Sequence, residues 1–117
     1  MNEKKIYPSV EDLYQIMLQL DANWMIEKIG VSDEEERVDV EVKYISKKAV
    51  DPMSGEQLSI YDHCPARQWR HLDTLQYKTF IVASIPRVKN SKGNVNMIEV
   101  PWADKSQRHT ILMEKKL

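Results

Sequence analysis

The sequence predicts an α+β fold, and three stretches of its 117 residues carry that prediction. Residues 9–20 place apolar side chains at helical spacing behind a serine that can cap the helix. Residues 37–44 alternate charged and apolar side chains, which is typical of a strand with one solvated face. Residues 80–88 are apolar on both faces of an extended segment, which indicates a strand buried on both sides.

The predicted helix begins at Ser9, whose hydroxyl can accept a hydrogen bond from the backbone amide of Asp12. Glu11 and Asp12 then lie at the positive end of the helix dipole, which favours acidic side chains. The apolar stripe that we expect to pack on the sheet consists of Leu13, Ile16, Met17 and Leu20.

A hairpin should follow this helix. Residues 24–29 alternate like a strand, residues 30–36 supply polar turn residues, and residues 37–44 form the second strand. The acidic run 33–36 lacks the spaced oxygen ligands and the turn glycine of a calcium loop, so we interpret it as a solvated turn.

Turn-forming residues divide the second half of the chain. Residues 52–55 and 90–94 predict tight turns, the second of them joining strands at 81–88 and 95–100. Pro86 has no amide to donate, so it must face a sheet edge, a bulge or the end of a strand. Residues 101–103 should close the sheet, and residues 108–117 should begin a helix.

Composition restricts the class of protein. A hydrophobic content of 42% with 30% charged residues is that of a soluble globular domain. The sequence has no apolar run long enough for a membrane span and no signal peptide at its start, so we expect a cytoplasmic protein. The single cysteine, Cys64, has no partner for an internal disulfide.

The net charge of −1 conceals a regional asymmetry. Residues 1–45 hold eleven acidic and five basic side chains, whereas residues 46–117 hold seven acidic and twelve basic side chains. A basic C-terminal region is a weak electrostatic signature of nucleic-acid contact, and solvated lysines alone would give the same count.

Three motifs resemble the N-terminal region of the insertion-sequence transposases of the ISL-three type. They are YDHCPARQWRHLD at 61–73, IPRVK at 85–89 and VPWA at 100–103, in the order and spacing of that family. The similar region runs from about Asp51 to Met113, and in those transposases a leucine-rich helix and a tryptophan-bearing hairpin also precede it. The resemblance implies an N-terminal helix, a β-hairpin and a small antiparallel sheet of zinc-ribbon type.

In that family two short knuckles hold a structural zinc ion, and here their ligand chemistry is lost apart from one carboxylate. We call the corresponding residues the four ligand positions; they are Asp51, Ser54, Asn90 and Gly93. The resemblance therefore implies a degenerate ribbon without metal or other cofactor, in which the hydrophobic core alone must hold the fold. Residues 1–45 and 46–117 would form one compact unit.

The resemblance implies a transposase-derived DNA-binding module that recognises terminal repeats or duplex DNA in general. The catalytic nuclease domain of the full transposases is absent from this sequence, so we expect no enzymatic activity. Arginine and lysine are the usual phosphate contacts, and the predicted DNA-binding residues are Arg67, Arg70, His71, Arg87 and Lys89. The alternative is a metal-free module that has lost DNA binding and binds a protein partner or a second copy of the chain. Neither a membrane nor a small-molecule substrate is expected.

Several other readings of these residues compete. Cys64 with nearby histidines and aspartates could be written as a catalytic set, but no nucleophile motif surrounds it. A substitute zinc set is equally weak, because its members lack knuckle spacing; they are His63, Cys64, His71 and His109. His71 more simply orients its loop by bonding to Asp73 or to backbone. Trp69 and Trp102 should be structural, because large aromatic side chains fill small cores.

Overall fold

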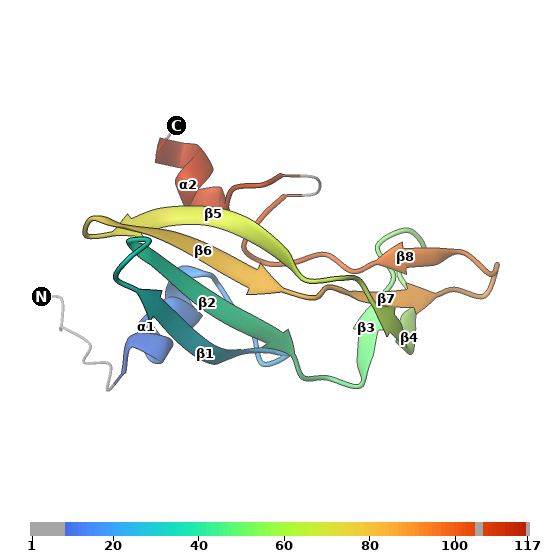
Figure 1. The fold of residues 1–117 in the computed structure, drawn as a ribbon. Coiled ribbons are helices and arrows are strands. Elements are labelled where there is room, and N and C mark those ends of the chain that lie inside the picture. Colours follow the sequence, from blue (N-terminus) through green and yellow to red (C-terminus); the bar gives the residue numbers. More distant parts are fainter. Residues whose placement is uncertain (1–8, 105–106, 117) are drawn as a thin grey trace, which may run out of the picture.

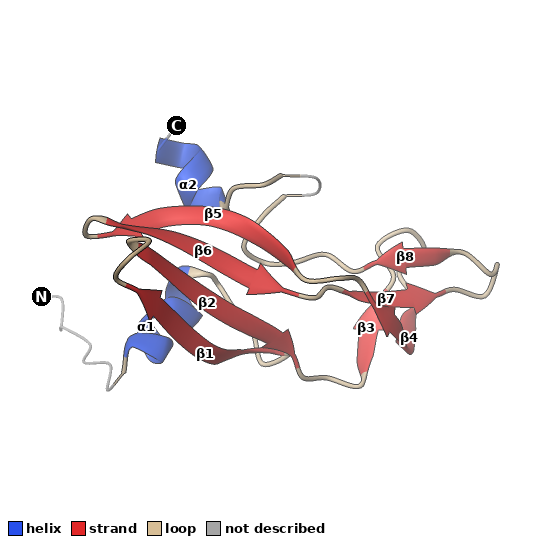
Figure 2. Cartoon of the chain, viewed as in Figure 1, coloured by secondary structure: helices blue, strands red, loops and turns tan. Residues whose placement is uncertain are grey.

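The computed structural model describes residues 9–104 and 107–116, and its fold is α+β. The two helices lie at the two ends of the described chain, with all the strands between them (Figures 1 and 2). The elements are α1 (Val10–Met17), β1 (Trp24–Ser32), β2 (Arg37–Tyr44), β3 (Lys48–Val50), β4 (Gln57–His63), β5 (Arg67–Thr74), β6 (Tyr77–Ala83), β7 (Pro86–Lys89), β8 (Val95–Met97) and α2 (Ile111–Lys116).

The first sheet has the strand order β1-β2-β6-β5. Two antiparallel hairpins, β1–β2 and β5–β6, are joined by parallel pairing of β2 with β6, so this sheet is mixed rather than wholly antiparallel. Its strands come from both sides of the boundary expected at residue 45. Residues 24–44 and 67–83 therefore share one sheet.

The second sheet has the order β3-β4-β7-β8 and is antiparallel throughout. The predicted turn at 90–94 does connect a hairpin, formed by β7 and β8. Figure 1 shows this sheet at the end of the molecule away from both helices, with the β7–β8 hairpin extending outward.

The expectation of one long strand over 80–88 is wrong. The segment forms β6 and β7, which belong to different sheets, with Ser84 and Ile85 between them. Pro86 is the first residue of β7, a position that tolerates its missing amide. In β6 only one face is fully buried, because Phe80 and Val82 lie half-buried on the other.

Aromatic side chains form the centre of the core. The Trp102 ring meets Trp24 and Trp69 edge-on, with ring centroids 4.8 and 5.3 Å apart. Trp69 and Trp102 are almost completely buried, which confirms that both are structural. The aliphatic core residues around them include Val40 and Ile81, which are paired across β2 and β6.

Helix α1 begins as predicted, with the Ser9 hydroxyl accepting from the Asp12 amide at 3.1 Å. The face it buries differs from the prediction, because Tyr14 and Leu18 are the buried residues. The Tyr14 hydroxyl lies 2.8 Å from the Thr74 hydroxyl of β5, and this contact fixes the rotation of the helix.

The helix therefore presents apolar residues to solvent. We call this surface the α1 stripe; it consists of Val10, Leu13 and Ile16, which are 57, 46 and 52% exposed. The expectation that Leu13 and Ile16 pack on the sheet is wrong.

The described residues show neither a cluster of metal ligands nor a helix that could span a membrane. The acidic run 33–36 is an exposed turn, as predicted. Within residues 9–104 and 107–116, no three His, Cys, Asp or Glu side chains gather as a metal site, so the substitute zinc set is not assembled. None of the helices in the described part of the chain is long and apolar enough to cross a membrane.

Candidate nucleic-acid interface

The five predicted DNA-binding residues lie on two strands of different sheets. Arg67, Arg70 and His71 are on β5 of the first sheet, whereas Arg87 and Lys89 are on β7 of the second. The structure therefore does not gather them into one patch.

His71 faces the core. Its Nδ1 lies 2.7 Å from the Thr110 hydroxyl, and burial together with the positive charge of Arg70 lowers the pKa of His71 to about 4. Its side chain is only 1% exposed, so His71 presents no surface to a nucleic acid. The sequence predicted a bond from His71 to Asp73 or to backbone, but its side-chain partner among the described residues is the Thr110 hydroxyl, and Asp73 pairs with Arg70.

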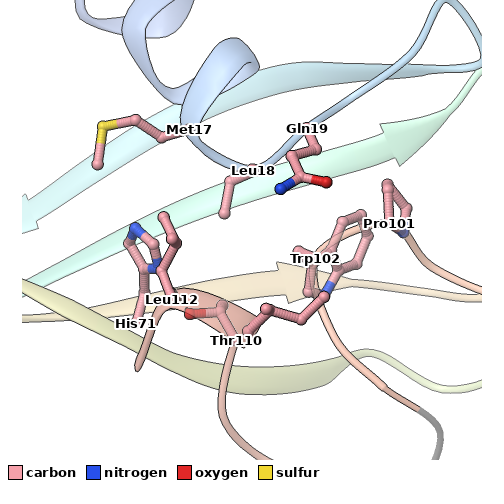
Figure 3. A pocket seen from close by; sticks show the side chains of 9 residues that line it. Met17, Leu18, Gln19, His71, Pro101, Trp102, Thr110 and Leu112 are labelled. Carbon is pink, nitrogen blue, oxygen red and sulfur yellow. Dashed lines mark hydrogen bonds between the residues drawn. The ribbon is translucent and has the colours of Figure 1, made fainter. Parts of the chain in front are cut away.

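His71 also lines a small, partly open cavity of about 10 Å³ beside the C-terminal end of α1. Figure 3 shows His71 and Trp102 on opposite sides of this cavity. Within the described residues, His71 Nε2 and Trp102 Nε1 are buried without a hydrogen-bond partner. The cavity has about the volume that one water molecule requires.

The two arginines of β5 are held by internal contacts. The Arg70 guanidinium pairs with Asp73, and its Nη1 donates to the carbonyls of His71 and Thr79 at 3.0 and 3.3 Å. The Arg67 guanidinium lies 4.7 Å from the centre of the Trp69 ring, and its Nη2 donates to the backbone carbonyl of Gln107. Both arginines thus already hold neighbouring parts of the fold together.

One face of the second sheet is solvated. Strand register and alternation place ten side chains on it, because their neighbours along each strand, such as Ala49 and Val88, turn into the core. We call this surface the outward face; it consists of Lys48, Val50, Gln57, Ser59, Tyr61, Asp62, Arg87, Lys89, Val95 and Met97.

A bulge in β4 shapes this face. The register with β7 shifts between Ile60 and Asp62, so Tyr61 is the extra residue. Because a bulge puts two successive side chains on one side of a strand, both Tyr61 and Asp62 can reach partners on β7. The Lys89 ammonium lies over the Tyr61 ring, 5.8 Å from its centre.

Arg87 is neutralised by a direct partner. Its Nε donates to Asp62 Oδ1 at 2.6 Å, and its Nη2 donates to Oδ2 of the same carboxylate. Hydrogen bonding and the opposite charge lower the pKa of Asp62 and raise that of Arg87. The charge available to a ligand therefore comes from Lys89 and Lys48, both of which are exposed.

Tyr61 belongs to the motif at 61–73, but it was not predicted from the sequence as a site residue. It is 55% exposed, and Val50 and Met97 on the same face are 55 and 41% exposed. The only signal in the sequence was an aromatic residue among polar residues of a strand, and this pattern does not reveal a bulge.

Three of the four ligand positions meet around the buried carboxylate of Asp51, in a cluster that contains no metal ligand set. Asp51 is fully buried, and its carboxylate accepts from Ser54 Oγ at 2.7 Å and from Asn90 Nδ2 at 3.0 Å. The Asn96 amide and the Met53 backbone amide also donate to it, at 3.0 and 3.3 Å. We call these residues the Asp51 cluster.

The Asp51 cluster joins the 52–55 turn to the β7–β8 hairpin. Hydrogen bonds, with the one from Ser54 the strongest, lower the pKa of Asp51 to about 2, so it stays ionised at neutral pH. Asn90 Oδ1 accepts from two amides of its own turn, each at 3.0 Å. Gly55 and Gly93 have φ angles of +79° and +85°, which side-chain-bearing residues rarely adopt. Sequence reasoning missed Asn96, which lies outside both turns.

A separate cleft of about 220 Å³ lies where the two sheets meet. Tyr44, Lys48 and Glu99 are among the residues that line it. None of the five predicted DNA-binding residues lines this cleft, although Lys48, Val50 and Gln57 belong both to the cleft and to the outward face.

Comparisons with known proteins identified no relative of this chain. A scan against protein-family models, a search of curated proteins and a search of solved structures each gave no match.

Proposed function

We propose that this chain is a DNA-binding module without catalytic activity, and that the outward face of the second sheet is its contact surface. The observation that carries the proposal is the exposed Tyr61 ring with the Lys89 ammonium over it. Basic side chains interleaved with an exposed aromatic ring are typical of nucleic-acid surfaces. The three basic residues of this face, Lys48, Arg87 and Lys89, exceed its one acidic residue, Asp62.

The shape of the second sheet supports the same proposal. The β7–β8 hairpin projects from the molecule (Figure 1), and a two-stranded ribbon is narrow enough to enter the major groove of DNA. Lys92 in the exposed turn at its tip would lie nearest to a phosphate backbone. The sheet would correspond to the zinc-ribbon-like part of a transposase, with the Asp51 cluster in place of the metal.

A salt-dependent gel shift on plain duplex DNA tests the proposal. With few phosphates neutralised, log affinity should fall with log salt by about 0.9 per phosphate contact. We expect Lys48→Glu combined with Lys89→Glu to abolish binding at low salt. The matched control is Lys43→Glu combined with Lys78→Glu, which makes the same charge change at exposed lysines of the first sheet. Equal losses in both double variants, or no binding by the wild type at low salt, would overturn the proposal.

The second candidate is a protein-interaction module, and the α1 stripe favours it. Val10, Leu13 and Ile16 form an exposed apolar line on one helix, a feature common at protein interfaces. Light scattering after size exclusion would show whether the chain self-associates. If it does, Leu13→Glu with Ile16→Glu should return it to a monomer, because both side chains are exposed and the substitutions leave the core intact.

A further inference from the structure

We propose that the outward face selects unpaired nucleotides, with the Tyr61 ring as the surface on which a base stacks. The inference rests on the proposed DNA-binding function and names its substrate class. Single-stranded DNA, or DNA with unpaired bases, would bind more tightly than the matching duplex.

The position of the Tyr61 ring favours contact with a base. The bulge in β4 holds Tyr61 on the solvated side of the sheet beside Asp62, and the ring is more than half exposed. A large aromatic side chain in this position gains little from the core. Its accessible π-face is the feature that sequence-tolerant single-strand binding uses.

Duplex DNA offers the Tyr61 ring little to contact. In a duplex the faces of the bases are covered by their neighbours, so a protein can contact only phosphates, sugars and the base edges in the grooves. Tyr61 could then contribute little, whereas an unpaired base presents a face that stacks on the ring. The exposed ring therefore favours an unpaired strand.

Lys89 and exposed apolar side chains share the outward face with the Tyr61 ring. Lys89 lies on the neighbouring strand β7, and its flexible ammonium can move from the ring to a phosphate when a base arrives. Met97 on β8 lies two strands away from Tyr61, roughly 10 Å at the usual strand spacing. Met97 and Val50 are further exposed apolar residues of the same face, which is therefore broad enough to contact more than one base.

Charge supports the same choice. The Arg87 charge is offset by Asp62, which leaves Lys48 and Lys89 for phosphates. Because only these two charges of the outward face are free, binding to duplex DNA through charge alone should be weak at physiological salt. Base stacking would supply the affinity that charge alone lacks.

The test compares fluorescence anisotropy of one labelled mixed-sequence oligonucleotide, single-stranded and as its duplex, at the same salt. We expect tighter binding of the single strand. Tyr61→Ala should weaken single-strand binding by about 5- to 150-fold, the range for loss of one stacked base. Tyr61→Phe should retain most of the affinity, and duplex binding should change less than twofold in either variant. Thermal melting of each variant confirms that the fold is intact.

The outcomes separate the two proposals. Duplex binding as tight as single-strand binding, with Tyr61→Ala unchanged, would overturn the inference and leave the DNA-binding function standing. Equal losses in Tyr61→Ala and Tyr61→Phe would also overturn it, because the hydroxyl rather than the ring would then matter. No binding to either oligonucleotide would overturn both, and capture of a peptide instead would favour the interaction module.

Discussion

Replacing Trp102 by alanine should destabilise the fold more than changes at the surface. The side chain is 2% exposed, and its ring contacts two other tryptophans edge-on. Truncating a buried tryptophan costs about 3–5 kcal/mol, of which each edge-to-face pair supplies about 0.5–1.5 kcal/mol. At about 4 °C per kcal/mol for a domain of this size, the melting temperature should fall by roughly 12–20 °C.

Chemical denaturation with urea gives the free energy of unfolding directly. Trp102→Phe should cost clearly less than Trp102→Ala, since it keeps an aromatic ring and removes an indole N–H that has no partner among the described residues. Met53→Ala, at a side chain 72% exposed, is the surface control and should stay within about 0.5 kcal/mol of wild type. A loss below about 1 kcal/mol for Trp102→Ala would refute the view that the tryptophan cluster organises the core.

Three further results are expected. Elemental analysis should find no stoichiometric zinc, because the four ligand positions lack thiolate and imidazole side chains, and a zinc-to-protein ratio near one would contradict this. Asp51→Ala should lower the melting temperature, because it removes the acceptor of four hydrogen bonds. The pKa of His71 is about 4 in the folded state, below its ordinary value of 6.5, so the unfolded chain binds the proton more readily. The free energy of unfolding should therefore fall as the pH drops from 6.5 to 4, by at most about 1.4 kcal/mol per pH unit. An equally steep dependence of stability on pH in His71→Gln would contradict this assignment. Arg87→Glu should lower the melting temperature because it places a carboxylate against Asp62, and Arg87→Met should do so less; equal melting curves for the two would show that the ion pair is unimportant.

The features that the sequence predicts correctly depend on neighbouring residues. The Ser9 cap, the turns at 52–55 and 90–94 and the alternation of β2 are each encoded within a few positions. The rotation of α1 is different, because it depends on a contact between Tyr14 and Thr74, sixty positions apart. Periodicity reports that a helix has an apolar side, but the contact decides which residues of that side are buried.

The pairing between distant strands could not be predicted from the sequence either. Parallel pairing of β2 with β6 unites two hairpins that look independent, and it moves Arg70 and His71 into the first sheet. Arg70 and His71 belong to the motif at 61–73, and Arg87 and Lys89 belong to the motif at 85–89. Their proximity in the sequence suggested that they form one basic patch. The chain instead changes sheets at Ser84 and Ile85, so residues close in sequence lie on different surfaces.

The partners of each basic residue matter more for binding than the number of basic residues. Arg70 and Arg87 each face an aspartate, and a ligand would have to compete with that carboxylate before it gained their charge. Lys89 faces an aromatic ring, which attracts the ammonium weakly and leaves it free to move. Because the lysine charge is thus available at little cost, we expect the affinity for nucleic acid to depend on Lys89 and on the ring beneath it rather than on the arginines that the motifs emphasise.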